Sequence, residues 1–251
     1  MEPEILEVRD VSKSYFEGGK VFPVLQDVRF VLGAHDLVSI VGPSGCGKST
    51  LLRIIVGLEK PTHGTVLFEG EEMRPENPQV AMVFQSFALF PWLTVEQNAE
   101  MGLEPLKISP EERHRRAGKY VEAVGLAGFE EAYPRELSGG MKQRVGIARA
   151  LALEPLLLCM DEPFSSLDAL TAQSLRDEVL QLWEQPDMPP QAVVMVTHDI
   201  EEAVYMADRI IVLSRLPGRV LAELKIDLPR PRNRKEPEFY GWTDEIYSLI
   251  V

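Results

Sequence analysis

Short apolar runs alternate with amphipathic stretches over most of the chain. The almost wholly apolar runs have the length of buried strands and lie at Leu37–Val41, Leu156–Met160, Ala192–Thr197 and Ile210–Leu213. Helical patterns follow the first three of these runs, at Ser49–Gly57, Ala169–Trp183 and Ile200–Met206. Strands that alternate with helices in this way predict βαβ units on a mostly parallel, buried sheet.

Three further strand-like runs, Ile5–Val8, Val28–Leu32 and Thr65–Phe68, do not follow this alternation. They predict an antiparallel sheet at the edge of the parallel one, formed largely by the N-terminal part of the chain. The fold class is therefore α/β, with a mostly parallel sheet and an N-terminal antiparallel β subdomain.

The pattern becomes helical between about Thr94 and Leu137. Ser109 is followed by Pro110 and Glu112, which is the order of an N-cap, a proline at the first helical position and a capping-box acid. This segment predicts a helical insert in the α/β core, at about residues 94–152. Since neither internal repeats nor a linker interrupt the chain, we expect one domain over 1–251, with only a turn at 186–190.

Composition and charge narrow the possible functions of this chain of 251 residues. The formal net charge of -13 disfavours a nucleic-acid platform, which needs clustered cations. With only two cysteines, Cys46 and Cys159, a disulfide framework is not expected. The first residues, Met1 to Glu4, do not resemble a leader, and no apolar run approaches the ~20 residues that span a bilayer. Any contact with a membrane is therefore expected to go through a partner protein.

A glycine-rich segment with the spacing G-x-x-x-x-G-K-[ST] lies directly between a predicted strand and a predicted helix. Its backbone N–H groups and the helix N-terminus are suited to phosphate oxygens, whereas a mere turn is the weaker interpretation. Lys48 is expected to reach the β- and γ-phosphates, and the Ser49 hydroxyl is expected to bind Mg²⁺. The predicted nucleotide-binding residues here are Gly42, Pro43, Ser44, Gly45, Cys46, Gly47, Lys48, Ser49 and Thr50.

Two adjacent carboxylates, Asp161 and Glu162, end the predicted strand Leu156–Met160. Side chains at the carboxyl end of a parallel strand lie at the ligand-binding edge of the sheet. Paired acids at such a place are often only solvated, but a phosphate-binding loop in the same chain favours a functional interpretation. Asp161 is expected to hold Mg²⁺ through its water shell, and Glu162 is expected to orient or deprotonate the attacking water.

Leu137–Met141 and the helix that follows, Lys142–Leu151, resemble the signature motif of ATP-binding-cassette (ABC) proteins. Ser138, Gly139 and Gly140 at a helix N-terminus provide a second anion site, although a simple helix cap explains the serine alone. Met141 stands where the commonest signature has Gln, and we expect activity to survive this departure. The resemblance implies a P-loop NTPase core whose helical insert carries the signature.

The remaining motifs of the family follow in order along the chain. The resemblance implies that Tyr15 stacks on adenine and that Gln85 contacts the metal and the attacking water. It also implies that Asp168 contacts the opposite subunit and that His198 holds the γ-phosphate and Glu162. Considered alone, Tyr15 also fits a core position and His198 an ordinary loop. The implied catalytic residues are Lys48, Gln85, Glu162 and His198, and the implied metal ligands are Ser49, Gln85 and Asp161.

The sequence is similar to the branch of importer ATPases for nitrate, sulfonate or taurine, through segments such as Leu216–Arg219 and Leu228–Arg232. This resemblance implies ATP and Mg²⁺ as ligands and ATP hydrolysis coupled to transport. It implies a dimer with a second copy or a homologous ATPase subunit, in which each ATP lies between one P-loop and the other chain's signature. Permease subunits, and indirectly a solute-binding protein, are the other implied partners, at the cytoplasmic face of the cell membrane.

Three alternatives share some of these motifs. An ATPase of DNA repair or chromosome maintenance has a long heptad-patterned insertion, whereas Thr50 and Leu137 are only 87 residues apart here. A translation-factor type has two cassettes and a basic linker, and an exporter half is usually fused to membrane helices. The single acidic cassette disfavours the first two alternatives, and the lack of an apolar run long enough to span a bilayer disfavours the third.

The segment Ser86–Leu93 after Gln85 is unusually apolar for a loop. Its side chains either pack the insert onto the core or line a groove for a short helix of the membrane partner. The second interpretation predicts that Phe90 or Trp92 couples the ATP site to transport.

Overall fold

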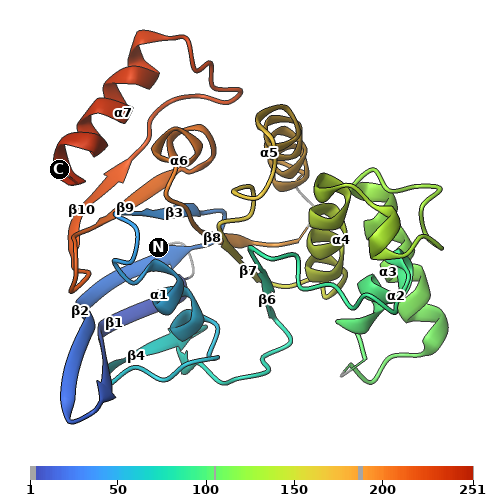
Figure 1. The fold of residues 1–251 in the computed structure, drawn as a ribbon, viewed down its shortest axis with the longest axis horizontal. Helices are drawn as coiled ribbons and strands as arrows, with labels where there is room; N and C mark the ends of the chain where they lie inside the picture. The colour runs from blue at the N-terminus through green and yellow to red at the C-terminus, as the bar shows by residue number, and fades with distance from the viewer. Residues whose placement is uncertain (1–3, 105, 186–188, 251) are drawn as a thin grey trace. The chain divides into compact units, whose positions relative to one another are not determined.

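Strands and helices follow one another in the order that the apolar pattern predicts (Figure 1). The computed structural model describes residues 4–104, 106–185 and 189–250. Residues 1–3, where no leader was expected, and residues 186–188 of the predicted turn lie outside this part of the chain. The described chain packs as two units, one formed by Met1–Asn77 with Ala192–Val251 and the other by Pro78–Gln191.

The first unit contains an antiparallel sheet in the order β2-β1-β4-β5. Its strands are β1 (Glu4–Glu17), β2 (Lys20–Gly33), β4 (His63–Phe68) and β5 (Glu71–Glu72). The sheet is separate, and it is not an edge of the parallel sheet as expected. β1 and β2 are also longer than predicted, because irregular pairing near Asp10 and Asp27, both at positive φ, interrupts the apolar alternation.

The parallel strands of the first unit are ordered β9-β3-β8, and β10 pairs antiparallel with β9. Their bounds are β3 (Leu37–Val41), β8 (Ala192–Val196), β9 (Arg209–Leu213) and β10 (Val220–Lys225). Every residue of β3 and β8 is buried, which explains their continuous apolar sequences.

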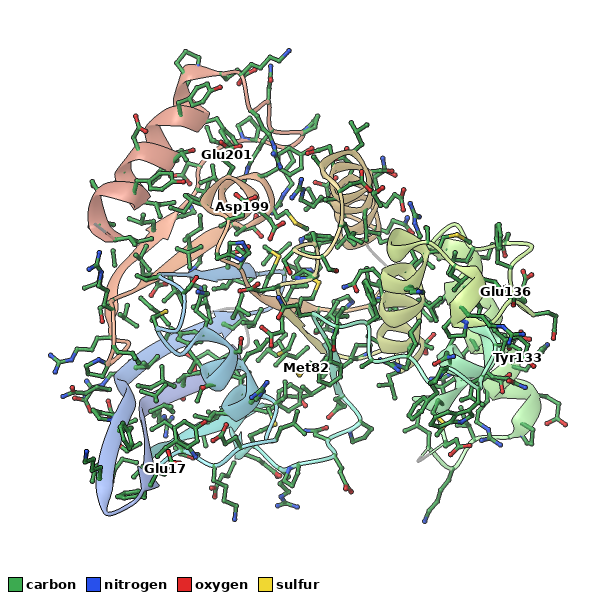
Figure 2. The ribbon with its side chains drawn as sticks, viewed as in Figure 1. Glu17, Met82, Tyr133, Glu136, Asp199 and Glu201 are labelled. Carbon is green, nitrogen blue, oxygen red and sulfur yellow. The ribbon has the colours of Figure 1, made fainter. Side chains whose placement is uncertain are left out.

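Among the residues described for this unit, the helices are α1 (Lys48–Ile55), α6 (Ile200–Met206) and α7 (Pro237–Ile250). α1 contacts β8, α6 contacts β3, and α7 contacts both α6 and β9. The Asp199 carboxylate accepts a hydrogen bond from the Glu202 N–H and so begins α6 (Figure 2). Phe239 and Ile246 of α7 are buried, so this face of the helix packs against the unit.

The second unit combines two parallel strands with helices. Its elements are β6 (Val80–Val83), β7 (Leu157–Asp161), α2 (Val95–Met101), α3 (Pro110–Ala123), the 3₁₀ turn η1 (Pro134–Glu136), α4 (Gly139–Ala152) and α5 (Ala169–Trp183). β6 and β7 pair in parallel, with Val80 opposite Leu157. α2, α3 and α4 contact one another, and they occupy the range predicted for the helical insert.

Side-chain caps explain where the helices of the insert begin. Ser109 accepts a hydrogen bond from the Glu112 N–H at 3.2 Å, which confirms the predicted start of α3. Thr94 and Gln97 form a reciprocal capping box at α2. At η1, the Tyr133 N–H donates to Glu136 Oε2 at 2.7 Å (Figure 2).

In the part of the chain that the structure describes, no helix has both the length and the apolar character needed to cross a membrane.

Candidate active site

The glycine-rich loop after β3 leads directly into α1. Gly47 is the N-cap of this helix, with φ 103°, and no side chain caps it. The first turn of α1, all of which the structure describes, contains no acidic residue. A helix start without a side-chain cap presents backbone N–H groups and the positive end of the helix dipole, which together suit an anion.

Lys48 supplies a positive charge inside this loop. The residue is only 6% exposed, and its Nζ donates hydrogen bonds to the carbonyl oxygens of Gly42 at 2.8 Å and Pro43 at 3.2 Å. Its partners here are neutral main-chain oxygens, so the ammonium charge is available to an incoming phosphate.

The main chain around Gly218 packs against the phosphate loop. The Gly218 N–H donates to the Val24 carbonyl at 2.8 Å, and the Gln26 N–H donates to the Gly218 carbonyl at 2.9 Å. A Cβ at Gly218 would lie 2.3 Å from the carbonyl oxygen of Cys46, much closer than real atoms approach. Only glycine therefore allows this turn to pack against the loop.

The two cysteines are buried and free. Burial raises the pKa of the Cys46 thiol even though Lys48 lies nearby, and burial also raises the pKa of Cys159. Thiols held in the protonated form are poor nucleophiles, so both residues act as small packing groups.

Tyr15 and His198 belong to the same unit as the loop. Tyr15 is 40% exposed. His198 is exposed and follows β8, which lies beside β3 in parallel. His198 and Gly42 therefore both follow the carboxyl ends of neighbouring parallel strands, at one edge of the sheet.

In the second unit, Gln85 and Glu162 meet at the ends of the paired strands β6 and β7. Gln85 Nε2 donates to Glu162 Oε2 at 3.1 Å and to Ser165 Oγ at 3.2 Å. The Ser165 hydroxyl in turn donates to the Glu162 carbonyl at 3.0 Å. Asp161, the last residue of β7, is only 7% exposed.

Glu162 has φ 44°, a left-handed backbone conformation that non-glycine residues seldom adopt. This conformation ends β7 and turns the chain, so that Glu162 does not continue the strand alternation of Asp161. Such strain costs on the order of 1–3 kcal/mol and is typical of functional sites.

The loop after Gln85 is also strained and is held by α4. Phe87 and Ala88 have φ values of 61° and 49°. Arg149 of α4 donates to the Ala88 carbonyl at 2.6 Å and to the Phe87 carbonyl at 3.3 Å. Burial lowers the pKa of Arg149, although a guanidinium stays charged at neutral pH. The arginine therefore fixes the loop to the helix that carries the signature.

Asn98 of α2 holds the far end of the same loop. Its Oδ1 accepts from the Phe90 N–H at 2.8 Å, and its Nδ2 donates to the carbonyls of Phe90, Leu93 and Thr94 at 3.2, 3.0 and 2.9 Å. The residue is fully buried, so removing its amide would leave several main-chain groups without partners.

The signature lies at the start of α4, beside the start of α5. Ser138 caps α4 by accepting from the Met141 N–H at 3.3 Å. A Cβ at Gly140 would lie 2.4 Å from Thr171 Cγ2, so packing against α5 requires this glycine. Gly139 is exposed and could carry a Cβ at ordinary contact distance, so packing does not explain it.

Asp168 caps α5 by accepting from the Thr171 N–H at 3.1 Å. Hydrogen bonds from the Thr171 side chain and backbone lower the pKa of this carboxyl, which therefore stays ionised at neutral pH. Within the second unit, the structure thus brings Asp168 to the neighbourhood of the signature.

The residues present fit the ligands that the sequence predicts. The first unit offers an uncapped helix start and a buried ammonium, which suit a polyphosphate. Ser49, Gln85 and Asp161 offer a hydroxyl, an amide and a carboxylate, and such oxygen donors suit Mg²⁺.

Comparison with known proteins assigns the family. The family model described as "ABC transporter" matches residues 25–165, more than half of the chain. The chain belongs to the ABC transporter family. This result confirms the predicted family and agrees with the motif order from the P-loop to the acid pair.

Two relatives illustrate the similarity to ATP-binding subunits. A nitrate import ATP-binding protein from Synechocystis is 44% identical over 98% of this chain and 94% of its own length. An aliphatic sulfonates import ATP-binding protein from Bacillus licheniformis is 44% identical over 93% of this chain and 89% of its own. These relatives favour an importer ATPase over the DNA-repair and translation alternatives.

A solved structure confirms the fold class. The ATP-binding cassette MJ0796, determined as a dimer in a post-hydrolysis state with ADP and Pi, matches with a TM-score of 0.77. It is 34% identical and the match covers 90% of this chain and 100% of that one. The chain is accordingly an ABC ATPase cassette.

Sequence reasoning did not identify Ser165, Asn98, Arg149 or Gly218 as parts of the site. Ser165 and Gly218 lie inside motifs that the sequence does reveal, so proximity to a motif was an available signal. Arg149 acts through main-chain carbonyls 61 and 62 residues away in sequence, and Asn98 binds main-chain groups four to eight residues away. No pattern of residue types indicates such contacts.

We predict that Gly218→Ala weakens ATP binding by the cassette by about tenfold or more, because the added methyl group would push the Cys46 carbonyl and shift the loop. Gly241→Ala is the matched control, since a Cβ there meets nothing within 4 Å. Titration with a fluorescent ATP analogue measures both affinities. Wild-type affinity in Gly218→Ala would show that this packing does not shape the loop.

Proposed function

We propose that this chain binds Mg²⁺–ATP and hydrolyses it to power an importer of a small anion. The observation that carries the proposal is the hydrogen bond from Gln85 to the strained strand-end residue Glu162. A carboxylate fixed in this way beside an amide is equipped to hold and deprotonate a water molecule.

The first unit binds the substrate in this proposal. The N–H groups of the loop 42–50 and the Lys48 ammonium hold the β- and γ-phosphates, and Tyr15 stacks on adenine. Ser49, Gln85 and Asp161 would hold Mg²⁺, whose charge would offset that of the phosphates.

Hydrolysis is phosphoryl transfer to water. Gln85 and Glu162 orient the water, and Glu162 accepts its proton as the oxygen attacks the γ-phosphorus and the bond to ADP breaks. His198 contacts the γ-phosphate and Glu162, and Lys48 stabilises the charge that develops on the transferred group.

The second anion site belongs to a partner copy. Ser138 and Gly139 of one chain bind the γ-phosphate held by the other chain's loop, and Asp168 contacts the opposite subunit. The exposure of Gly139, which packing does not explain, supports this role. ATP thus closes the dimer, and hydrolysis reopens it.

The relatives are named for the import of nitrate and of aliphatic sulfonates, and both solutes are small oxyanions. We propose a solute of this class, delivered by a solute-binding protein to permease subunits. The cassette then lies at the cytoplasmic face of the membrane through its contact with those subunits.

The contact with the permease is made by the loop after Gln85. Trp92 is 69% exposed, and its ring lies 5.6 Å from that of Phe90, the residue that Asn98 holds. Because Arg149 and Asn98 fasten this loop to the insert, a movement of Gln85 is passed to the exposed aromatic surface.

We predict that Glu162→Gln retains ATP binding but lowers turnover by about a hundredfold or more, because the amide keeps the shape and loses the base. The variant should form an ATP-bound dimer. Gel filtration with ATP and a phosphate-release assay measure both effects. Glu184→Gln, the same change at an exposed helix end, is the control. A monomer with normal turnover would contradict the role of Glu162.

We predict that Lys48→Ala weakens ATP binding, whereas Ser138→Ala spares binding to the monomer and blocks dimer closure and hydrolysis. Ser138→Ala also removes a helix cap, which costs about 1 kcal/mol. Ser109→Ala removes an equivalent serine cap from α3 and controls for that loss. Equal losses of dimer closure and hydrolysis in Ser138→Ala and Ser109→Ala would show that Ser138 acts only as a helix cap.

We predict that Trp92→Ser leaves the isolated cassette folded and active but weakens assembly or solute-stimulated hydrolysis in the complete transporter by several-fold. The side chain is exposed, so its loss costs the fold little. Phe129→Ser changes another exposed aromatic residue of the same unit and should have no such effect. Unfolding of Trp92→Ser would favour a core role, and unchanged stimulation would exclude Trp92 from the coupling path.

A further inference from the structure

The hydroxyl of Tyr15 is bound by a residue outside every motif. Tyr15 Oη donates a hydrogen bond of 2.7 Å to Glu59 Oε1. Glu59 lies in the segment between α1 and β4, and its side chain is 21% exposed. The far end of the aromatic ring is therefore held by a largely buried carboxylate.

Lys13 completes this arrangement from β1. Its Nζ lies 2.9 Å from Glu59 Oε1 and donates to the Lys60 carbonyl at 2.7 Å. The same ammonium lies 5.1 Å from the centroid of the Tyr15 ring. A cation thus lies over one face of the ring, and the residue is still 40% exposed, so part of the ring is accessible to another partner.

The protonation states suit these contacts at neutral pH. Burial opposes ionisation of Glu59, but hydrogen bonds from Tyr15 and Lys13 outweigh it and lower the pKa of this carboxyl below its ordinary value. Burial and the Glu59 hydrogen bond raise the pKa of Tyr15. Glu59 therefore remains an ionised acceptor and Tyr15 a neutral donor.

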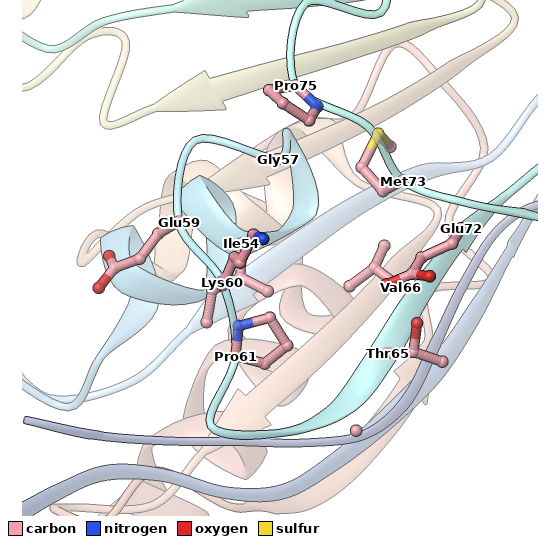
Figure 3. A pocket seen from close by; sticks show the side chains of 11 residues that line it. Ile54, Gly57, Glu59, Lys60, Pro61, Thr65, Val66, Glu72, Met73 and Pro75 are labelled. Carbon is pink, nitrogen blue, oxygen red and sulfur yellow. The ribbon is translucent and has the colours of Figure 1, made fainter.

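The carboxylate of Glu59 does not point into the cavity beside it. Glu59 and Lys60 contribute to the lining of a cavity of about 230 Å³, together with Val66 and Met73. Figure 3 shows the Glu59 carboxylate turned away from Val66 and Met73. The side chain is thus directed to Tyr15 and Lys13.

We propose that Glu59, held by Lys13, is a positioning residue that fixes the Tyr15 ring for adenine. The inference rests on the proposed function, in which Tyr15 stacks on the base of ATP. A ring fixed before binding loses less conformational entropy when adenine stacks on it.

The strand that carries Tyr15 has anchors independent of Glu59. The Ser14 N–H donates to Thr62 Oγ1 at 3.0 Å, and the Thr62 N–H donates to the Ser12 carbonyl at 2.8 Å. Replacing Glu59 should therefore free the ring without detaching the strand.

The test compares ATP with inorganic tripolyphosphate, which lacks adenine, by calorimetric titration of the purified cassette. Glu59→Met removes the acceptor and should raise the Kd for ATP about three- to tenfold, the effect of one net hydrogen bond. The Kd for tripolyphosphate should not change.

Tyr15→Phe should weaken ATP binding by the same factor, and the double variant should bind ATP no more weakly than either single variant. Glu59→Gln, which keeps an oxygen acceptor, should recover most of the affinity.

Glu72→Met is the matched control, because Glu72 is an exposed acid on the same cavity and should leave both affinities unchanged. Unchanged ATP affinity in Glu59→Met, or an equal loss for tripolyphosphate, would overturn the role of Glu59. Tyr15→Ala separates this failure from that of the proposed function. If Tyr15→Ala binds ATP normally, the adenine role of Tyr15 is wrong, and the proposal for Glu59 is wrong with it.

Discussion

The phosphate loop depends on a close approach between two stretches of main chain. The turn at Gly218 is hydrogen-bonded to the strand residues Val24 and Gln26, and it lies so near the Cys46 carbonyl that no side chain fits. These contacts fix a loop in which Gly42, Gly45 and Gly47 would otherwise allow many backbone conformations. With the loop fixed, α1 begins without a side-chain cap and Lys48 folds over the main-chain carbonyls, so that charge and N–H groups are ready for phosphate.

The second unit is organised by strain that its neighbours hold in place. Glu162 leaves its strand in a left-handed conformation and is bound by Gln85 and Ser165. The loop after Gln85 contains two more such residues, and Arg149 and Asn98 hold it through main-chain carbonyls. Strained segments of this kind adopt few alternatives, so a small displacement of Gln85 has a defined consequence at the far end of the loop.

Apolar periodicity predicted the strands of the parallel sheet and the bounds of α5 and α6, because buried strands and capped helices leave strong local signals. The extents of β1 and β2 were not predictable, since bulges near Asp10 and Asp27 break the alternation. Motif spacing indicated the phosphate-binding loop, and resemblance to the ABC family supplied the other candidate residues of the site. Contacts such as Tyr15 with Glu59 join residues distant in sequence, and residue type alone does not reveal them.

The central claim is that one nucleotide is held by two copies of this chain. The most direct test is a crystal structure of the Glu162→Gln variant with Mg²⁺–ATP. The account predicts a two-fold dimer in which each γ-phosphate contacts Lys48 of one chain and Ser138 and Gly139 of the other. A structure with ATP bound in full by one chain, and with Ser138 remote from any phosphate, would contradict it.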